Sequence, residues 1–417
     1  MAVSERLLAP APPEQAGAEL RVVTAPPAEA LRRAVRVRFH RRLDSLDILR
    51  GAAVAAMVLV NNPATGQPYL YSQMTHAAWN GWHFADVVFP TFLFAVGASL
   101  AFSTVKRDQP LPAWKAYRRI ARRGIVLFAL GLVVNDFSLF ATHVPDPLGH
   151  LRIMGVLQRI AIAYVLVALA VMHLRIRTQV IIAVAVLVGY WAVLARVPVP
   201  GVGHPSMTPA ASIPGWIDRT VFGASHIYGG GKLGYDPEGL LGCLPAAVGV
   251  MAGFWAATFV RLRRGRTFTT LSLAAGGIGC TAAGELWSSV LPINKRMWTP
   301  SYVVLMTGLC LLALSVLHFL FDCRGRLAQG MGKPLSFLGA NALVAYVGSE
   351  LTGAALQDWH HAANGVAGAP LAFWVWFRWL MPAFGGTLGA LMYGALILAG
   401  WWAVAALLSQ RRIFIRA

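Results

Sequence analysis

Residues 61–86 read NNPATGQPYLYSQMTHAAWNGWHFAD, and this segment joins two long apolar runs of the chain. It is much longer than a turn between two helices requires, and it carries a titratable imidazole at His76. Polar side chains close to a lipid bilayer cost free energy unless they are paired or used. We therefore interpret the segment as the functional end of a membrane protein.

The composition supports a membrane protein. Hydrophobic residues make up 57% of the 417 residues and charged residues only 13%, and the mean hydropathy is +0.58. Soluble domains contain about 25% charged residues. The apolar runs have lengths of about 17–25 residues, which suit about 30 Å of hydrocarbon. We expect an all-α, polytopic integral membrane protein with about ten transmembrane helices. The predicted helices cover residues 46–61, 84–104, 119–135, 151–172, 179–195, 239–260, 268–290, 300–320, 335–356 and 385–408.

The positions of the basic residues predict the topology. The net charge of +19 could indicate a nucleic-acid partner, but 28 of the 36 Lys and Arg residues fall on the side of the predicted bundle that holds the N-terminus. This asymmetry follows the positive-inside rule, so both termini are expected in the cytoplasm and no nucleic-acid partner is expected. The Trp-rich stretch 369–382 is short and contains Arg378, which favours an interfacial or re-entrant helix.

The chain divides into two parts. Residues 1–41 are rich in Pro, Ala and Arg and predict a disordered cytoplasmic tail, with a weak amphipathic helix on anionic lipid as the alternative. Residues 42–417 form the predicted transmembrane domain. The four cysteines do not form metal-spaced clusters, so we expect free thiols and no metal.

The predicted topology places the polar loops that follow alternate helices on one face of the membrane. Converging polar side chains between membrane helices are typical of a functional site. The candidate residues on this face are Asn61, His76, Asn80, Asp86, Asp236, Glu238, Asn294, Lys295 and Glu350.

Seven segments stand out in order along the chain. They are RLDSLDILRG (42–51), the loop from Asn61 to His76, HAAWNGWHFADVVFPTFLFAVGASL (76–100), RIMGVLQRIAIAY (152–164), DPEGLLG (236–242), PINKRMWTPSYV (292–303) and NALVAYVGSE (341–350). Together they resemble the heparan-α-glucosaminide N-acetyltransferase family, within the wider transmembrane acyltransferase group. Pro63 departs from the eukaryotic pattern, which has aromatic and glycine residues after the asparagine that matches Asn61.

The resemblance implies that residues 42–417 are a transmembrane acyltransferase domain. Cytosolic acetyl-CoA would give its acetyl group to a glucosamine-like amino sugar on the other side of the membrane, without a metal. His76 matches the family's active-site histidine, and Asn61 matches a supporting asparagine. The resemblance also favours a homodimer, and we expect a bacterial inner membrane as the location.

The residue types suit acyl transfer by themselves. His76 can remove the amine proton as a general base, or it can attack the thioester and carry the acetyl group. Asn61 can donate to an oxyanion or simply end a helix, and Asp86 can orient the imidazole or complement a helix dipole. Both alternatives remain open for each residue, and direct transfer needs fewer steps.

Further residues are assigned by their charge and position. Arg152 and Arg159 lie seven residues apart, on one face of a predicted helix, and with Asn80 they are the candidate acetyl-CoA contacts. Asp47 and Arg50 are expected to form a structural i, i+3 pair, with a contact to CoA as the alternative. The candidate acceptor contacts are Asp236, Glu238, Asn294, Lys295 and Glu350, although Asp236 and Glu238 could instead cap a helix.

Two other functions remain consistent with the sequence. The first is an amino-sugar transporter or permease, which would need a path open alternately to both faces and no CoA chemistry. The second is an enzyme with the same chemistry that acylates another envelope glycan or an amino sugar of a natural product.

Overall fold

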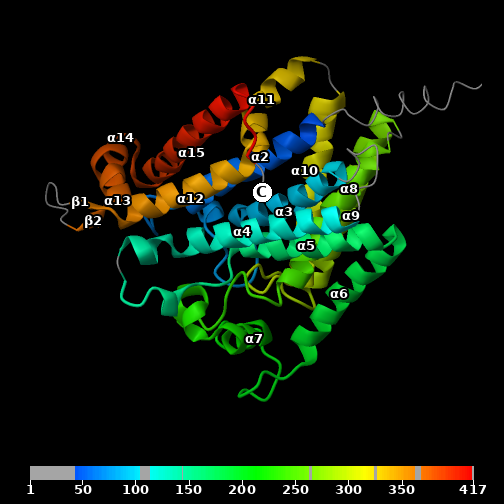
Figure 1. The fold of residues 1–417 in the computed structure, drawn as a ribbon, viewed down its shortest axis with the longest axis horizontal. Coiled ribbons are helices and arrows are strands. Elements are labelled where there is room, and N and C mark those ends of the chain that lie inside the picture. The colour runs from blue at the N-terminus through cyan, green and yellow to red at the C-terminus, as the bar shows by residue number, and fades with distance from the viewer. Residues whose placement is uncertain are drawn as a thin grey trace, which may run out of the picture. The chain divides into compact units, whose positions relative to one another are not determined.

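The computed structural model describes residues 43–103, 113–142, 144–262, 265–323, 326–361 and 368–415 (Figure 1). The predicted tail at 1–41 lies outside the described residues. The longer helices are α2 (Asp44–Asn61), α3 (Phe84–Ser103), α4 (Ala113–Ala141), α5 (Val156–His173), α6 (Ile176–Arg196), α7 (Ile213–Phe222), α8 (Cys243–Arg261), α9 (Arg266–Ser288), α10 (Pro300–Leu317), α11 (Arg326–Ala340), α12 (Ala342–Asp358) and α15 (Gly386–Gln410). The short elements are η1 (Ser72–Met74), η2 (Leu148–His150), η3 (Ala224–His226), η4 (Tyr228–Gly231), η5 (His318–Cys323), β1 (His360–His361), β2 (Ala369–Pro370), α13 (Leu371–Val375), η6 (Trp376–Leu380) and α14 (Met381–Phe384).

The all-α, polytopic architecture expected from the sequence is confirmed. Within the described residues, seven helices are long and apolar enough to cross a membrane, namely α3, α4, α5, α6, α8, α10 with η5, and α15. Helices also occupy the other three predicted ranges, as α2, α9 and α12. α2 carries Asp44, Asp47 and Arg50 near its start, and α12 has only 17 residues and contains Glu350, which lowers the apolar character of both.

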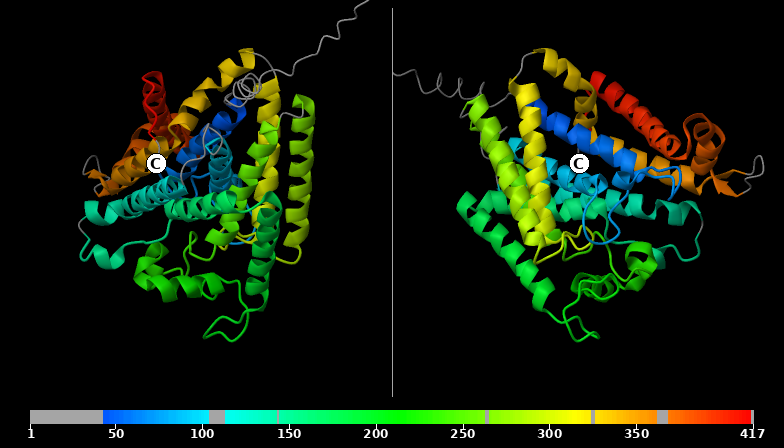
Figure 2. Two further views of the ribbon diagram at one scale, coloured as in Figure 1. Left: turned by 45° about the vertical axis from the view of Figure 1, so that its right-hand side comes forward. Right: turned by 180° about the vertical axis from the view of Figure 1, so that it is seen from behind.

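Helix pairs in the bundle approach closely where glycines face a neighbouring backbone. α3 packs on α8, α2 on α11, and α9 on α10, and the last pair runs side by side in both views of Figure 2. A Cβ built on Gly253 of α8 would overlap the carbonyl of Phe94 in α3, and one built on Gly51 of α2 would overlap that of Leu335 in α11. Small residues at such crossings allow the van der Waals contacts on which helix association in lipid depends.

The structure corrects two predicted helix boundaries. The predicted helix 335–356 is interrupted at Asn341, where a φ of −120° and a ψ of 38° separate α11 from α12. The predicted helix 151–172 begins only at Val156, because Gly155 before it is extended. Arg152 therefore precedes α5 and does not share a helix face with Arg159.

The stretch 369–382 contains no long helix. It forms β2 and the short helices α13, η6 and α14, and the apolar helical part runs over Leu371–Phe384. This length is too short for a full span, and the interfacial or re-entrant position expected there stays a prediction.

Three connecting segments meet at one end of the bundle. They are the loop between α2 and α3, the segment 197–242 between α6 and α8, which includes α7, and the loop between α9 and α10 (Figure 2). Hydrogen bonds join them, because Trp79 donates to the carbonyl of Met207 at 2.8 Å and Gly81 donates to the carbonyl of Ile293 at 2.8 Å. This end carries most of the candidate site residues.

We predict that Gly253→Ala lowers the thermal stability of the purified protein, because the new methyl group has to displace the α3 backbone. Overpacking of this kind costs about 1–3 kcal/mol. Gly279→Ala in α9 is the control, since a Cβ there meets nothing within 4 Å. Melting temperatures in detergent should fall for Gly253→Ala and stay level or rise for Gly279→Ala. Equal melting temperatures would contradict the close packing.

Candidate functional site

The carboxylate of Asp86 is the centre of a polar cluster in the first turn of α3. Its Oδ1 lies 2.8 Å from Nδ1 of His76, and its Oδ2 accepts the backbone N–H groups of Ala77 at 3.0 Å and His83 at 2.9 Å. The side chain of Asp86 is 1% exposed, whereas that of His76 is 36% exposed. One buried carboxylate thus fixes the path of the loop and the orientation of the imidazole.

Lys295 brings a cation to the same cluster. Its Nζ lies 3.0 Å from Nδ1 and 3.2 Å from Nε2 of His76, and 3.4 Å from Oδ1 of Asp86. Because it is nearly equidistant from both ring nitrogens, the ammonium lies against the ring and not along a single lone pair. Burial lowers the pKa of Lys295, although the carboxylates of Asp86 and Glu238 pull it upward.

A second contact holds the Lys295 loop against the His76 loop. Gly81 and Asn294 form a parallel β-bridge, and Nδ2 of Asn294 donates to Oδ1 of Asn80 at 3.1 Å. Gly81 has a φ of 91°, in the left-handed region that favours glycine. The sequence predicted that Asn80 contacts acetyl-CoA and that Asn294 contacts the acceptor sugar. In the structure they bond to each other, and this contact brings Lys295 to His76.

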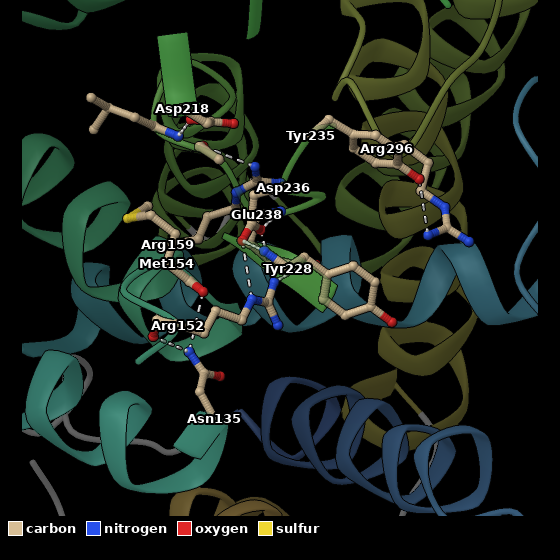
Figure 3. Close-up of polar contacts among 12 residues, drawn as sticks. Asn135, Arg152, Met154, Arg159, Asp218, Tyr228, Tyr235, Asp236, Glu238 and Arg296 are labelled. Atoms are coloured by element: carbon tan, nitrogen blue, oxygen red, sulfur yellow. Dashed lines mark hydrogen bonds and ion pairs between the residues drawn. The ribbon is translucent and has the colours of Figure 1, made fainter. Parts of the chain in front are cut away.

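A cluster of buried charges lies beside this centre (Figure 3). Nε and Nη2 of Arg152 donate to the two carboxylate oxygens of Asp236 at 3.0 and 2.8 Å, and Nη2 also donates to Oε2 of Glu238 at 2.6 Å. The guanidinium stacks on the ring of Tyr228, with its carbon 4.6 Å from the ring centroid. Arg152 therefore clamps the Asp236–Glu238 segment, and these carboxylates raise its pKa despite burial.

Asp236 and Glu238 do not cap a helix, which corrects that reading of the sequence. α8 begins at Cys243, so both residues precede it by more than one turn. Asp236 instead accepts the backbone N–H groups of Tyr228 at 2.9 Å and Glu238 at 2.8 Å. Its carboxylate therefore shapes the local loop.

Glu238 connects the charged groups electrostatically. Burial would raise the pKa of Glu238, but the positive charges of Arg152, Arg159 and Lys295 outweigh burial and hold the pKa below its usual range. Because Lys295 also contacts His76, the two clusters belong to one electrostatic unit.

Arg159 is almost completely buried, with 1% of its surface exposed. Its Nη2 donates to the carbonyl of Gly239 at 3.2 Å, and its guanidinium carbon lies 4.6 Å from the ring centroid of Trp298. Nε and Nη1 have no hydrogen-bond partner among the described residues. Buried donors without partners cost free energy, so a carbonyl or phosphate oxygen of a ligand is a suitable partner.

Asn61 and Glu350 are paired with each other. Nδ2 of Asn61 donates to Oε1 of Glu350 at 2.8 Å, which joins the end of α2 to the middle of α12. Asn61 is the last residue of α2, and the neighbouring Asn62 takes the cap position and donates to the carbonyl of Val58 at 3.0 Å. The described contacts thus place Asn61 beside Glu350 and connect neither of them directly to His76.

The structural i, i+3 pair expected at the start of α2 is confirmed. Nη2 of Arg50 lies 2.8 Å from Oδ1 of Asp47, and Nη1 of Arg50 donates to Ser99 at 3.0 Å.

The sequence interpretation missed three residues that support the site. Tyr302 donates to the backbone carbonyl of Asp86 at 2.6 Å, Trp298 stacks on Arg159, and Asp218 accepts the N–H of Leu240 at 2.9 Å. Trp298 and Tyr302 also line a small, mostly apolar cavity between α3, α8 and α10. An arginine in an apolar run requires an aromatic or acidic neighbour, and this requirement could have indicated Trp298.

A metal site was not expected from the sequence. Within the described ranges, no group of three or more His, Cys, Asp or Glu side chains could hold a metal ion. The described cysteines are free thiols.

Comparison with known proteins finds a family model that matches the first part of the transmembrane region. The family model described as "Heparan-alpha-glucosaminide N-acetyltransferase, catalytic" matches residues 42–209. The resemblance noted in the sequence motifs is therefore confirmed for these residues, which include His76 and Asp86.

Two curated proteins are similar over a longer range. The chain is 29% identical over 364 residues to the heparan-alpha-glucosaminide N-acetyltransferase of Homo sapiens, a match that covers 74% of this chain and 53% of the human protein. It is 29% identical over 366 residues to the protein of the same name from Mus musculus, with the same two coverages of 74% and 53%. The chain spans about half the length of these curated relatives.

We predict that Arg152→Ala strongly destabilises the protein, because it leaves Asp236 and Glu238 as unpaired buried carboxylates. Breaking a buried ion pair in this way costs about 3–5 kcal/mol. Because the native pKa of Glu238 is lowered, the stabilisation is present above its ordinary value of 4.5 and is lost as the pH falls below it.

Thermal unfolding of wild type and Arg152→Ala at several pH values measures this effect. The difference in melting temperature should be largest near pH 7 and shrink towards pH 4. Arg196→Ala, which alters an exposed arginine at the end of α6, is the control. A difference that grows with acidity would contradict the assignment.

Proposed function

We propose that this chain, whose residues 42–209 match the model of the heparan-alpha-glucosaminide N-acetyltransferase catalytic family, is a membrane N-acetyltransferase. The acetyl donor is acetyl-CoA from the cytoplasm, and the acceptor is the amino group of a glucosamine-like sugar on the other side of the membrane. Both termini are cytoplasmic in this proposal. His76 acts at the outer end of the bundle, where the polar loops gather.

The observation that carries the proposal is the placement of His76 between Asp86 and Lys295. The bond from Nδ1 of His76 to Asp86 favours the tautomer with the proton on Nδ1, which leaves a lone pair on Nε2. The lone pair on Nε2 can accept the proton of the attacking amine.

The transfer then proceeds in one acyl-exchange step. The amine nitrogen attacks the thioester carbonyl carbon, and the amine proton passes to Nε2 of His76. The carbon–sulfur bond breaks as the tetrahedral intermediate collapses, and the CoA thiolate leaves and takes up the proton. The ammonium of Lys295 is a cationic donor that can stabilise the oxyanion of the intermediate. Direct transfer is preferred to an acetyl-histidine intermediate because it needs only one aligned attack.

We assign the remaining charged residues either to the binding of acetyl-CoA or to the binding of the amino-sugar acceptor. Arg159 is assigned to acetyl-CoA because its Nε and Nη1 are buried donors without partners among the described residues. Arg152 is bonded to Asp236 and Glu238, so it serves to hold the acceptor side of the site. Glu238 supplies negative charge that attracts a protonated amino group, and Glu350 with its partner Asn61 is assigned to the same side.

We predict that His76→Ala abolishes acetyl transfer while membrane insertion and melting temperature are retained, since the ring is partly exposed. Transfer of radiolabelled acetyl from acetyl-CoA to glucosamine-type acceptors is the measurement. His204→Ala is the control, because His204 is exposed and its side chain bonds only to the neighbouring carbonyl of Pro205 among the described contacts. Substantial turnover by His76→Ala would contradict the assignment. Amino-sugar flux into proteoliposomes without acetyl-CoA would favour the transporter.

We also predict that Asp86→Asn lowers kcat, because the ring loses the carboxylate that fixes its tautomer. Loss of general-base catalysis corresponds to about 10²–10⁴-fold. The KM for acetyl-CoA should change little, since Asp86 contacts the histidine and not the donor. A large rise in that KM with an unchanged kcat would show that Asp86 serves binding instead.

A further inference from the structure

One peptide group near the site is held between two buried, oppositely charged side chains. Nη2 of Arg159 donates to the carbonyl of Gly239 at 3.2 Å, and Oδ1 of Asp218 accepts the N–H of Leu240 at 2.9 Å. The carbonyl and the N–H belong to the same peptide bond, so the two side chains bind its opposite ends (Figure 3). This arrangement links α5 to α7 through the segment that precedes α8.

The two charges stabilise each other through this peptide. Asp218 is fully buried and Arg159 nearly so, and no ion pair joins them directly in the described part of the chain. A peptide whose N–H faces a carboxylate and whose carbonyl faces a guanidinium makes two charge-assisted hydrogen bonds, and each strengthens the other. Displacing either side chain therefore loosens the Gly239–Leu240 peptide.

Sterics make the arrangement specific. A Cβ built on Gly239 would overlap the carboxylate of Asp218, and one built on Gly242 would lie 2.7 Å from Nη2 of Arg159. The close approach of both charged groups thus requires glycine at these two positions of the DPEGLLG segment. The bound peptide directly follows Glu238, which bonds to Arg152.

We propose that Asp218 is a positioning residue that, through this peptide, holds Glu238 and Arg159 in place for the transfer reaction. The inference rests on the proposed function, and it assigns a role to a residue of α7. Asp218 itself contacts neither His76 nor Lys295 among the described contacts, so its effect is exerted through the peptide.

The charge of Asp218 is maintained at a cost in stability. Burial is the main cause that raises the pKa of Asp218 to about 6, and the negative charge of Asp236 acts in the same direction. The hydrogen bond from Leu240 and the positive charge of Arg159 act against this rise. Tyr190 of α6 and Cys243 of α8 are the other titratable groups within its electrostatic range. A carboxyl with a raised pKa stabilises the fold below its unfolded pKa of 3.8, and this contribution is lost as the pH rises through about 6.

The decisive variant is Asp218→Asn, which keeps an oxygen for Leu240 but removes the charge. We expect kcat/KM for the acceptor to fall between about 10- and 100-fold at pH 7.5, as for a displaced positioning group. The melting temperature at pH 7.5 should stay level or rise, because the cost of the buried charge is gone. A residue with a purely structural role would instead give wild-type activity once the hydrogen bond is retained.

Asp322→Asn is the matched control. Oδ1 of Asp322 also accepts a backbone N–H, from Asp44 at 3.2 Å. Lys295 precedes α10, whereas Asp322 follows it in η5 at the opposite end of that helix. Asp322→Asn should therefore leave acetyl transfer unchanged. Gly239→Ala is the second test, because it displaces the carboxylate without removing its charge, and it should lower kcat/KM as Asp218→Asn does.

The outcomes separate this inference from the proposed function. Wild-type kcat/KM in Asp218→Asn, measured with active wild-type enzyme, would overturn the inference alone. If Asp218→Asn does not fold, wild-type activity in Gly239→Ala would overturn it in the same way. Absence of acetyl transfer by wild type itself would overturn the proposed function, and the inference with it.

Discussion

The buried carboxylate of Asp86 is the group on which the arrangement of the site depends. It receives two backbone N–H groups, the His76 ring and the charge of Lys295, which come from the loop before α3 and the loop before α10. Because a carboxylate buried near lipid must have partners, the two loops are held together by an electrostatic requirement. The same requirement fixes the His76 ring while its side chain stays partly exposed.

Charge pairing also explains how so many ionisable groups are accommodated in an apolar bundle. Arg152 binds Asp236 and Glu238, while Arg159 and Asp218 share one peptide. Each positive group thus has a negative group on a different chain segment. Buried pairs of this kind add little net stability, but they fix the relative positions of the segments they join. A reaction centre benefits from such fixed positions more than from stability.

The sequence predicted the parts of the structure that depend on local patterns. The long apolar runs predicted the helices, and the spacing of Asp47 and Arg50 predicted their pair. The motif around His76 placed the loop correctly at the start of α3. The breaks at Gly155 and Asn341 were missed because apolar residues continue on both sides of each, so hydropathy alone does not show where a helix stops.

Contacts between residues far apart in the sequence could not be predicted from local sequence patterns. Arg152 and Asp236 are separated by 84 residues, and Asn61 and Glu350 by 289. Arg152 was expected to contact the donor, yet its bonds to Asp236 and Glu238 depend on how the segment before α8 folds back. Asp218 lies in a loop helix with an ordinary sequence, and only its contact with the N–H of Leu240 shows that it belongs beside the site.

The most direct measurement of the central claim is a structure of the protein with a non-hydrolysable ketone analogue of acetyl-CoA in lipid. The account predicts that the carbonyl carbon of the analogue lies near His76, with room for an amine within about 3–3.5 Å of that carbon and hydrogen-bonding reach to Nε2. It also predicts that Asp86 keeps its contact with Nδ1. An analogue bound with its carbonyl far from His76, or a His76 ring turned towards lipid, would contradict the account.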